Sequence, residues 1–350
     1  LLAALPAVVS RTPRLDPLAL YDVQDGDGSS SIQMHVVRVE RFESRFMNSD
    51  SGLSRPIIIT CLGTDGRKYR QVIKADDVRS DAIMMQVFET MNTLLSRDPR
   101  ARRRALHIRT YRVLPLTPES GVLEFVENTK NLGGLLVASN DRAMALHERY
   151  NGDTDFSSRE CRELLKAART SEERREAYQT ITQNFHPAFR FFFLETFPDP
   201  ALWYRKRLHY TRSVAVSSIV GYVLGIGDRH ASNILVDQAT AGLVHIDFGY
   251  TFEQGKILPQ PETVPFRLTR DVVDAMGVTG TEGVFRQCCN TTMAVLRQHA
   301  PSLLTILEVC VHDPLHSWVR AGVPQMLAGG EAAGLMAALG LSLIHISEPT

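Results

Sequence analysis

Five short runs rich in β-branched and aromatic residues mark the first third of the chain. They cover residues 32–39, 57–62, 69–74, 106–114 and 122–126. Runs of this length, bounded by turn residues, are typical of β-strands. The stretch Gly63-Thr64-Asp65-Gly66 is a turn between two of them. The pattern therefore predicts an antiparallel sheet.

A helical period interrupts these strand runs. The apolar positions at helical spacing are Ile83, Met84, Val87, Phe88, Met91 and Leu95. Three acids, Asp76, Asp77 and Asp81, stand at the start of this stretch, and acidic side chains are stabilising near a helix N-terminus. We therefore expect one helix packed against the sheet.

The pattern becomes mostly helical after Glu127, and we place a domain boundary there. Apolar residues between 216 and 223 predict a helix that Gly225 ends. Two short strands, residues 233–236 and 243–246, are expected to pair around a turn. The predicted fold class is α+β with two lobes: an antiparallel-sheet lobe with one main helix, and a mostly helical lobe.

The ends of the chain differ in composition from its centre. Residues 1–31 are rich in Pro, Gly and Ser toward their end and are interpreted as a linker or tail. The two lobes are then residues 32–127 and 128–321. Residues 322–350 are Ala/Gly/Leu-rich and form an atypical tail of native or non-native origin. The glycines and Glu331 within it argue against a membrane span.

Charge and cysteine content exclude several classes of protein. The chain has 39 basic and 39 acidic residues, so no net field draws it to nucleic acid or to an anionic membrane. A local arginine cluster comprises Arg97, Arg100, Arg102, Arg103 and Arg104; it is interpreted as a solvated loop, with phosphate contact as the alternative. The 5 cysteines lack metal-ligand spacing, which favours a reducing compartment, cytosol or nucleus.

One passage carries recognisable chemistry. Asp228-Arg229-His230 is followed at Asn233 by an amide and, after a strand, by Asp247-Phe248-Gly249. Protein kinases have an Asp that handles the acceptor hydroxyl, an Asn five positions later that holds Mg²⁺, and a DFG Asp that binds metal. The spacing matches, although the first three letters are reversed from His-Arg-Asp.

This reversed motif resembles that of the phosphatidylinositol 3-kinase superfamily. Over residues 61–318 the chain resembles the kinase domain of the phosphatidylinositol 3-kinase-related protein kinases. The segments that carry it are residues 212–215, 217–222, 252–259 and 261–271. The resemblance implies that Asp228, His230, Asn233, Asp247 and Lys74 are the catalytic residues. His230 is either a general base or a neighbour that orients the transferring phosphate.

The cofactors expected are ATP and Mg²⁺, with Mn²⁺ as a substitute. A carboxylate and an amide oxygen suit Mg²⁺, which takes one or two protein ligands beside phosphate, so Asp247 and Asn233 are the predicted metal ligands. Lys74 is expected to hold the nucleotide phosphates through an ion pair with Asp76 or Asp81. The segment from Lys74 to Asp81 resembles the family pattern with one residue missing, which leaves the pairing acid open.

The adenine pocket is predicted at the lobe boundary. An adenine needs a backbone donor and acceptor between apolar walls. The expected hinge is Leu123, Glu124, Phe125 and Val126, and the expected walls are Leu235, Ile246 and Tyr111. His245 is interpreted as a structural histidine. The sequence has no glycine-rich phosphate loop of known type; residues 49–54 are either its counterpart or a plain polar turn.

The resemblance implies an ATP-dependent serine/threonine protein kinase that prefers Ser or Thr followed by Gln. It further implies DNA double-strand-break signalling and checkpoint control, nuclear localisation with a cytoplasmic fraction, an oligomeric parent protein, and no direct nucleic-acid or membrane binding by this piece. Two alternatives are a phosphoinositide lipid kinase of the same superfamily and a catalytically silent scaffold. The presence of all five catalytic residues disfavours the scaffold.

Overall fold

A computed structural model describes residues 22–24, 30–32, 37–49, 55–137, 144–152, 155–252, 254–257 and 262–311. The predicted tail at 322–350, most of the predicted linker and residues 50–54 lie outside these ranges. The chain divides into two compact units. The first comprises residues 1–86 and 110–127, and the second comprises residues 87–109 and 128–350. Strands β1 (Asp22–Gln24) and β2 (Ser30–Ile32) form a separate antiparallel pair.

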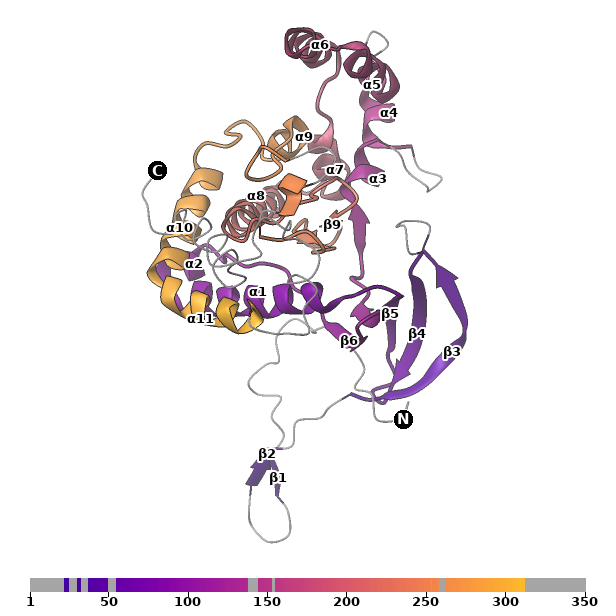
Figure 1. Cartoon of the computed structure of the whole chain (residues 1–350), viewed down its shortest axis with the longest axis vertical. Helices are drawn as coiled ribbons and strands as arrows, with labels where there is room; N and C mark the ends of the chain where they lie inside the picture. The colour runs from indigo at the N-terminus through magenta and orange to yellow at the C-terminus, as the bar shows by residue number, and fades with distance from the viewer. Residues whose placement is uncertain are drawn as a thin grey trace, which may run out of the picture. The chain divides into compact units, whose positions relative to one another are not determined.

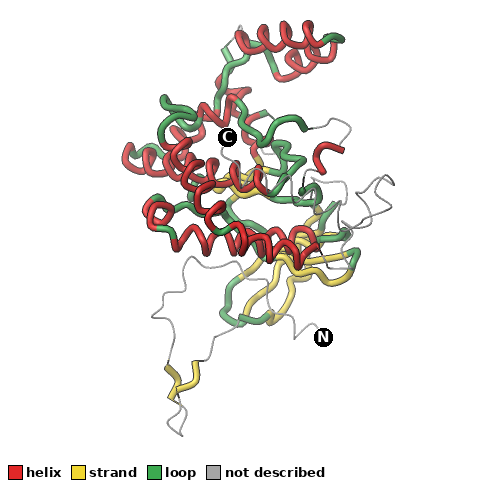
Figure 2. Tube along the Cα trace, turned by 60° about the vertical axis from the view of Figure 1, so that its left-hand side comes forward, coloured by secondary structure: helices red, strands yellow, loops and turns green. Residues whose placement is uncertain are grey.

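The first unit is built on a five-stranded antiparallel sheet, as the sequence predicted (Figures 1 and 2). Its strands in spatial order are β3 (Val39–Asn48), β4 (Ile57–Gly63), β5 (Lys68–Lys74), β7 (Ser120–Glu124) and β6 (Val113–Thr117). The Gly63–Gly66 turn closes with a 2.9 Å hydrogen bond from the Gly66 N–H to the Gly63 carbonyl. Gly66 has φ +75°, a conformation that glycine adopts without steric cost.

The sequence misplaced the first strand of this sheet. We expected it at residues 32–39, of which residues 33–36 lie outside the described ranges, whereas β3 begins at Val39 and continues to Asn48. This strand lies at the sheet edge and nearly all its side chains are exposed. Its charged composition protects an edge from pairing with other chains, and it removes the apolar alternation on which strand prediction depends.

A second correction concerns residues 106–112, which were predicted as part of a strand and are not one. The Asn92 side chain replaces a neighbouring strand there. Its amide donates to the Ile108 carbonyl at 2.8 Å and accepts from the Ile108 N–H at 2.8 Å. A side chain can thus satisfy the hydrogen-bonding groups of a backbone segment that has no strand partner. The pattern of apolar residues alone does not reveal such a contact.

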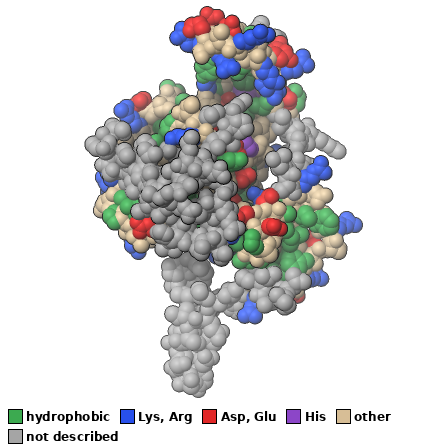
Figure 3. All heavy atoms as spheres, viewed as in Figure 1, with side chains coloured by type: hydrophobic (Ala, Val, Ile, Leu, Met, Phe, Trp, Pro, Cys, Tyr) green, Lys and Arg blue, Asp and Glu red, His purple; other side chains and the backbone are tan. Residues whose placement is uncertain are grey.

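The second unit is mostly helical. Helix α1 (Arg79–Arg97) begins in the first unit and continues into the second. The other helices are α2 (Pro99–Arg103), α3 (Leu132–Leu136), α4 (Leu146–Tyr150), α5 (Ser158–Ala167), α6 (Ser171–Asn184), α7 (Phe189–Thr196), α8 (Pro200–Val223), η3 (Gln254–Ile257), α9 (Arg270–Asp274), α10 (Val284–Gln298) and α11 (Ala300–Val311). Charged side chains cover α5 and α6 (Figure 3).

A small sheet accompanies these helices. Strands β9 (Ile234–Asp237) and β10 (Leu243–His245) pair antiparallel, as predicted. A third strand, β8 (Thr129–Asn131), pairs with β9, although the sequence pattern was interpreted as helical from this point. Three residues are too few to show a strand period, so pairing with β9 decides the conformation.

Helix α8 is the central element of the second unit. Its last three turns are almost wholly buried, and α10 packs along it. An aromatic cluster surrounds Tyr210, which is 0% exposed and lies edge-on to the rings of Phe189 and Phe193. The Tyr210 hydroxyl donates a 3.0 Å hydrogen bond to the Val272 carbonyl. The cluster therefore fixes α8, α7 and α9 together.

Helix α8 begins at a cap that can be tested. The Asp199 carboxylate accepts a 2.8 Å hydrogen bond from the Leu202 N–H, and Pro200 occupies the first helical position. Replacing an N-cap acid by alanine typically costs about 1 kcal/mol. We predict that Asp199→Ala lowers the free energy of unfolding by about that amount, measured by urea denaturation. Asp199→Asn, an equally good cap, is the matched control, and equal losses in both variants would contradict the capping role.

Candidate active site

The loop after α8 and the segment after β10 carry the residues that the motif predicted. Three of them adopt left-handed backbone conformations: Gly225 with φ +56°, Asp228 with φ +56° and Asp247 with φ +63°. Glycine takes this conformation freely, but for an aspartate it costs of order 1–3 kcal/mol. Strain of this kind persists only where surrounding contacts hold it. Contacts with the surrounding structure must therefore hold the backbone of both acids in this conformation.

Asn233, at the C-terminal end of this loop, stabilises the loop by hydrogen bonds. Its side chain is buried, and its amide nitrogen donates to the Asp228 carbonyl at 3.0 Å. Its N–H donates to the His230 carbonyl at 3.0 Å, and its carbonyl accepts from the Ile246 N–H at 3.1 Å. These bonds join the Asp228 loop to the chain just before Asp247. They leave the Asn233 amide oxygen as the remaining acceptor of that side chain.

His230 lies at the exposed side of the same loop. Its Nδ1 accepts a hydrogen bond from the Ser232 N–H at 3.2 Å, which assigns the proton of the neutral ring to Nε2. Nε2 lies 3.9 Å from the Asp228 carboxylate oxygen. The two side chains are 53% and 34% exposed, so both remain accessible to a reacting group.

Arg229 binds the two acidic segments to each other. Its Nε donates to the Gly227 carbonyl at 2.8 Å, one guanidinium NH₂ group donates to the Ile246 carbonyl at 2.8 Å, and the other donates to the Asp247 carbonyl. A guanidinium offers five N–H donors in a rigid fork, which suits several carbonyls at once. The Arg229 side chain is thus the physical link between the Asp228 loop and Asp247.

Phe248 anchors the segment after Asp247 in the core. It is 0% exposed, and its ring lies edge-on to Phe88 of α1 with centroids 5.3 Å apart. The Arg229 guanidinium carbon lies 5.3 Å from the centre of the same ring. The neighbouring Asp247 is exposed. Burial of the ring therefore fixes the backbone while the carboxylate stays at the surface.

Two further bonds attach the segment after Phe248 to the loop. The Gly227 N–H donates to the Tyr250 carbonyl at 2.9 Å, and the Phe252 N–H donates to the Leu224 carbonyl at 2.9 Å. A side chain at Gly227 would stand 2.8 Å from the Cα of Gly255, so glycine is required there by close backbone approach.

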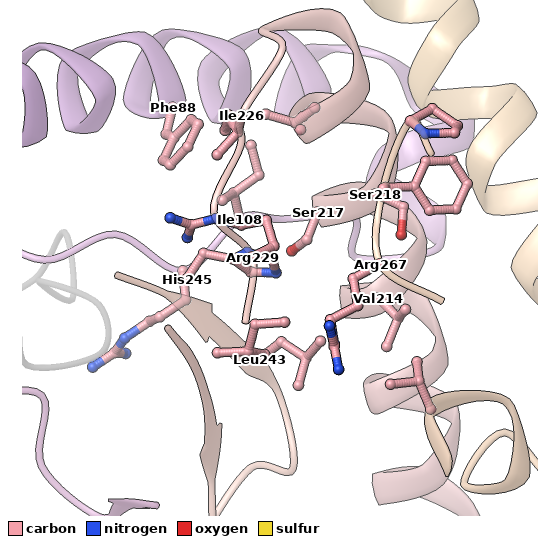
Figure 4. A pocket seen from close by; sticks show the side chains of 17 residues that line it. Phe88, Ile108, Val214, Ser217, Ser218, Ile226, Arg229, Leu243, His245 and Arg267 are labelled. Atoms are coloured by element: carbon pink, nitrogen blue, oxygen red, sulfur yellow. The ribbon is translucent and has the colours of Figure 1, made fainter. Parts of the chain in front are cut away.

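His245 is a half-buried neighbour of these groups (Figure 4). Burial, with a smaller contribution from the Arg229 charge, lowers the pKa of His245 to about 3. The imidazole is therefore neutral near pH 7, since its charged form is fully populated only well below that pKa. This environment agrees with the interpretation of His245 as a structural residue, which stays a prediction.

Most of the remaining predicted residues of the phosphate and adenine sites belong to the first unit. Lys74 ends β5, half-buried and opposite Gly121 of β7. Within the ranges that the structure describes, Lys74 forms no ion pair with Asp76 or Asp81. Asp81 is 3% exposed and accepts a 3.0 Å hydrogen bond from the Tyr111 hydroxyl. The identity of the acid that pairs with Lys74 stays open.

The predicted hinge follows directly from β7. Leu123, Glu124 and Val126 are buried, and the Glu124 carboxylate accepts from the Arg112 N–H at 3.0 Å. Phe125 is half-buried beneath the Arg70 guanidinium, 4.0 Å from its ring centre. In the second unit, Leu235 lies in β9 and Ile246 directly follows β10, and both are half-buried.

The residues present fit a magnesium ion. The exposed Asp247 carboxylate and the Asn233 amide oxygen are hard oxygen donors, and Mg²⁺ binds proteins through one or two such ligands while retaining water and phosphate oxygens. Within the second unit, Asp228, His230 and Asn233 come from one loop, and Asp247 comes from the segment that adjoins it. Sequence reasoning missed Arg229 and Phe248, although both are letters of the two motifs.

Comparison with known proteins decides the family. The profile of the family "Phosphatidylinositol 3- and 4-kinase" matches residues 69–320. The chain belongs to the phosphatidylinositol 3- and 4-kinase family. Its kinase-type fold, with an antiparallel-sheet lobe and a mostly helical lobe, is thereby confirmed. Members of this kinase family use ATP and a divalent metal.

Within this kinase family, the chain is similar to the ataxia-telangiectasia-mutated group. It is 52% identical to the serine-protein kinase ATM of Sus scrofa over 81% of this chain and 9% of that protein. A solved structure titled "FAT and kinase domain of CtTel1" matches with a TM-score of 0.80 and 44% identity over 93% of this chain and 22% of that one. A "Complete CtTel1 dimer with C2 symmetry" matches equally over 12% of its chain.

These relatives are much longer than this chain. The chain spans less than a quarter of the length of each of them. In the described part of the chain, no helix is long and apolar enough to cross a membrane.

Arg229 provides a test of the site that does not depend on catalysis. We predict that Arg229→Lys raises amide hydrogen exchange over residues 246–250 at least about tenfold, ~1.4 kcal/mol, because an ammonium cannot reach three carbonyls as the fork does. Arg102→Lys, on an exposed residue of α2, is the matched control. Unchanged exchange in the Arg229 variant would show that other contacts hold Asp247.

Proposed function

We propose that this chain is the catalytic domain of an ATP-dependent serine/threonine protein kinase. The observation that carries the proposal is the Arg229 link between two strained acids, Asp228 and Asp247. Phosphoryl transfer depends on positioning and electrostatic stabilisation, so its acids must be held in fixed places. The printed names of the relatives, serine-protein kinase ATM among them, support the same activity.

Each residue then has a role that its surroundings allow. Asp228 orients the acceptor hydroxyl, and its carboxylate is accessible at 34% exposure. His230, protonated at Nε2 in the neutral ring, is placed to donate toward the transferred group or to Asp228. Asn233 and Asp247 would hold Mg²⁺, which when bound neutralises charge on the phosphates. Lys74 of the first unit is proposed to contact phosphate oxygens.

The acceptor is proposed to be a protein hydroxyl and not an inositol lipid. A multiply phosphorylated headgroup requires a cluster of Lys and Arg. Between residues 247 and 266 the sequence has only one basic residue, Lys256, which is exposed, and it has Glu262 nearby. Glu253 and residues 258–261 lie outside the described residues.

A Gln after the acceptor residue is the proposed recognition feature. Its proposed pocket is a hollow of about 220 Å³ that residues 262–265 border and that Tyr222 and Ile226 also line. A hollow of this size accommodates a side-chain amide, which needs a compact apolar wall and a few hydrogen-bonding groups.

The wider role of the parent protein is also a proposal. The similarity to ATM and Tel1 supports signalling from DNA double-strand breaks, a nuclear location with a cytoplasmic fraction, and protein substrates. The solved CtTel1 structure is described as a dimer, which supports an oligomeric parent. No nucleic-acid contact is proposed for the arginine cluster of residues 97–104, in which Arg100 pairs with Asp98 and Arg104 donates to Gln287.

The proposal predicts transfer of phosphate from ATP to a Ser-Gln peptide. Replacing Gln by Ala in the peptide should lower kcat/KM at least about tenfold, because unpaired polar groups remain in the site. A radiolabelled-ATP assay with phosphoinositide vesicles in parallel measures both acceptors. Lipid phosphorylation at a rate equal to or above that of the peptide would instead favour the lipid kinase, and nucleotide binding without any transfer would favour a scaffold.

Asp247→Asn should lower Mg²⁺-dependent turnover about 100-fold or more while preserving the fold, because it weakens a metal ligand without changing side-chain size. Glu176→Gln, an exposed charge removal on α6, is the matched control. Turnover and circular dichroism are measured on both. Turnover within twofold of the unmodified chain would remove Asp247 from the metal site.

A further inference from the structure

Residues 125–127 end the first unit and follow directly on β7. The pairing of β5 with β7 ends where Gln71 lies opposite Glu124. One backbone hydrogen bond continues beyond that pair, from the Phe125 N–H to the Arg70 carbonyl at 3.2 Å. The regular strand pairing that fixes the start of the predicted hinge thus stops before the hinge ends.

The Arg70 side chain contacts this segment beyond the end of the paired strands. Its Nε donates to one oxygen of the Glu127 carboxylate at 2.7 Å, and one of its terminal NH₂ groups donates to the other oxygen. The guanidinium carbon also lies 4.0 Å from the centre of the Phe125 ring. A single side chain of β5 therefore contacts two alternate residues of the segment that leaves the sheet.

These contacts are of kinds that restrict geometry. Two parallel N–H···O bonds between a guanidinium and a carboxylate are more directional than a single bond, and a guanidinium over an aromatic ring adds cation–π attraction. The hydrogen bond to Glu127 raises the pKa of Arg70, against a smaller lowering by burial. The two side chains are 36% and 42% exposed, so solvent weakens the attraction between their charges. The pair is thus suited to fixing a conformation more than to stabilising the fold.

A fixed conformation matters at a hinge that binds a flat base. A base is recognised by a few precisely placed backbone groups, and a hydrogen bond weakens steeply away from its preferred distance and angle. Phe125 and Glu127 are the two chain neighbours of Val126, the last residue of the predicted hinge. By contacting both, Arg70 limits the backbone on either side of Val126.

We propose that Arg70 and Glu127 are positioning residues for the nucleotide base. The Arg70 guanidinium, acting through Phe125 and Glu127, holds the hinge backbone in the conformation that an adenine ring binds. This inference rests on the proposed kinase function and on the predicted hinge. Because the base is bound equally before and during phosphoryl transfer, loss of this positioning should weaken nucleotide binding and leave the chemical step unchanged.

The test is nucleotide affinity, measured by calorimetry on the purified chain with ADP and separately with adenosine. Arg70→Gln should raise the Kd of both about fivefold or more, because binding must then order the hinge. KM for ATP should rise in parallel while kcat stays within about twofold. A purely structural defect would instead lower the number of binding sites and kcat at unchanged Kd, and that result would overturn the inference.

The two ligands separate a role at the base from a role at the phosphates. A loss of affinity for ADP alone, with adenosine binding unchanged, would show that Arg70 acts as a charge on phosphate, and the inference would be wrong. Equal Kd values in Arg70→Gln and the unmodified chain would also overturn it. Failure of the unmodified chain to bind any nucleotide would refute the proposed function, and the inference with it.

Further variants locate the effect. Arg70→Lys keeps the charge but not the planar fork, so it should lose affinity as Arg70→Gln does. Glu127→Gln should weaken adenosine binding, and because this side chain is partly exposed it carries the test if Arg70→Gln does not fold. Arg41→Gln, at an exposed arginine of β3 in the same sheet, is the matched control and should retain full affinity.

The double variant Arg70→Gln/Glu127→Gln tests whether the two residues act as a pair. It should bind adenosine no more weakly than Arg70→Gln alone, because the interaction between them is already lost in the single variant. Losses that simply add would show that Glu127 acts independently of Arg70, which contradicts the proposed pair.

Discussion

The geometry of the candidate active site depends on one guanidinium. Arg229 donates to carbonyls on both sides of the gap between the Asp228 loop and Asp247, and it lies against the Phe248 ring. Lysine offers a single point charge and cannot form these bonds together. The two acids come from segments separated by a complete strand pair, and the Arg229 side chain joins these segments together with the backbone bonds of Asn233, Gly227 and Phe252. The family chemistry therefore rests on a residue that need not touch substrate.

The same link explains how the chain tolerates left-handed backbone at two aspartates. Each such residue costs of order 1–3 kcal/mol. Asn233, through its bonds to Asp228 and His230, and the buried Phe248 ring offset that cost at either end. Hydrogen bonds and burial of a large ring each contribute energies of this order. The strain is thus held by contacts formed before any ligand arrives, which is the preorganisation that phosphoryl transfer requires.

The sequence predicted most of this architecture where short patterns carry the information. Strands β4 and β5, the last two turns of helix α8 and the β9–β10 pair followed from apolar period and turn residues, and Asp228, Asn233 and Asp247 followed from motif spacing. It failed where a distant partner decides: β3 is an exposed edge strand, and Asn92 holds Ile108 from another element. The role of Arg229 was missed for the same reason, since its acceptors are carbonyls and any residue type supplies a carbonyl.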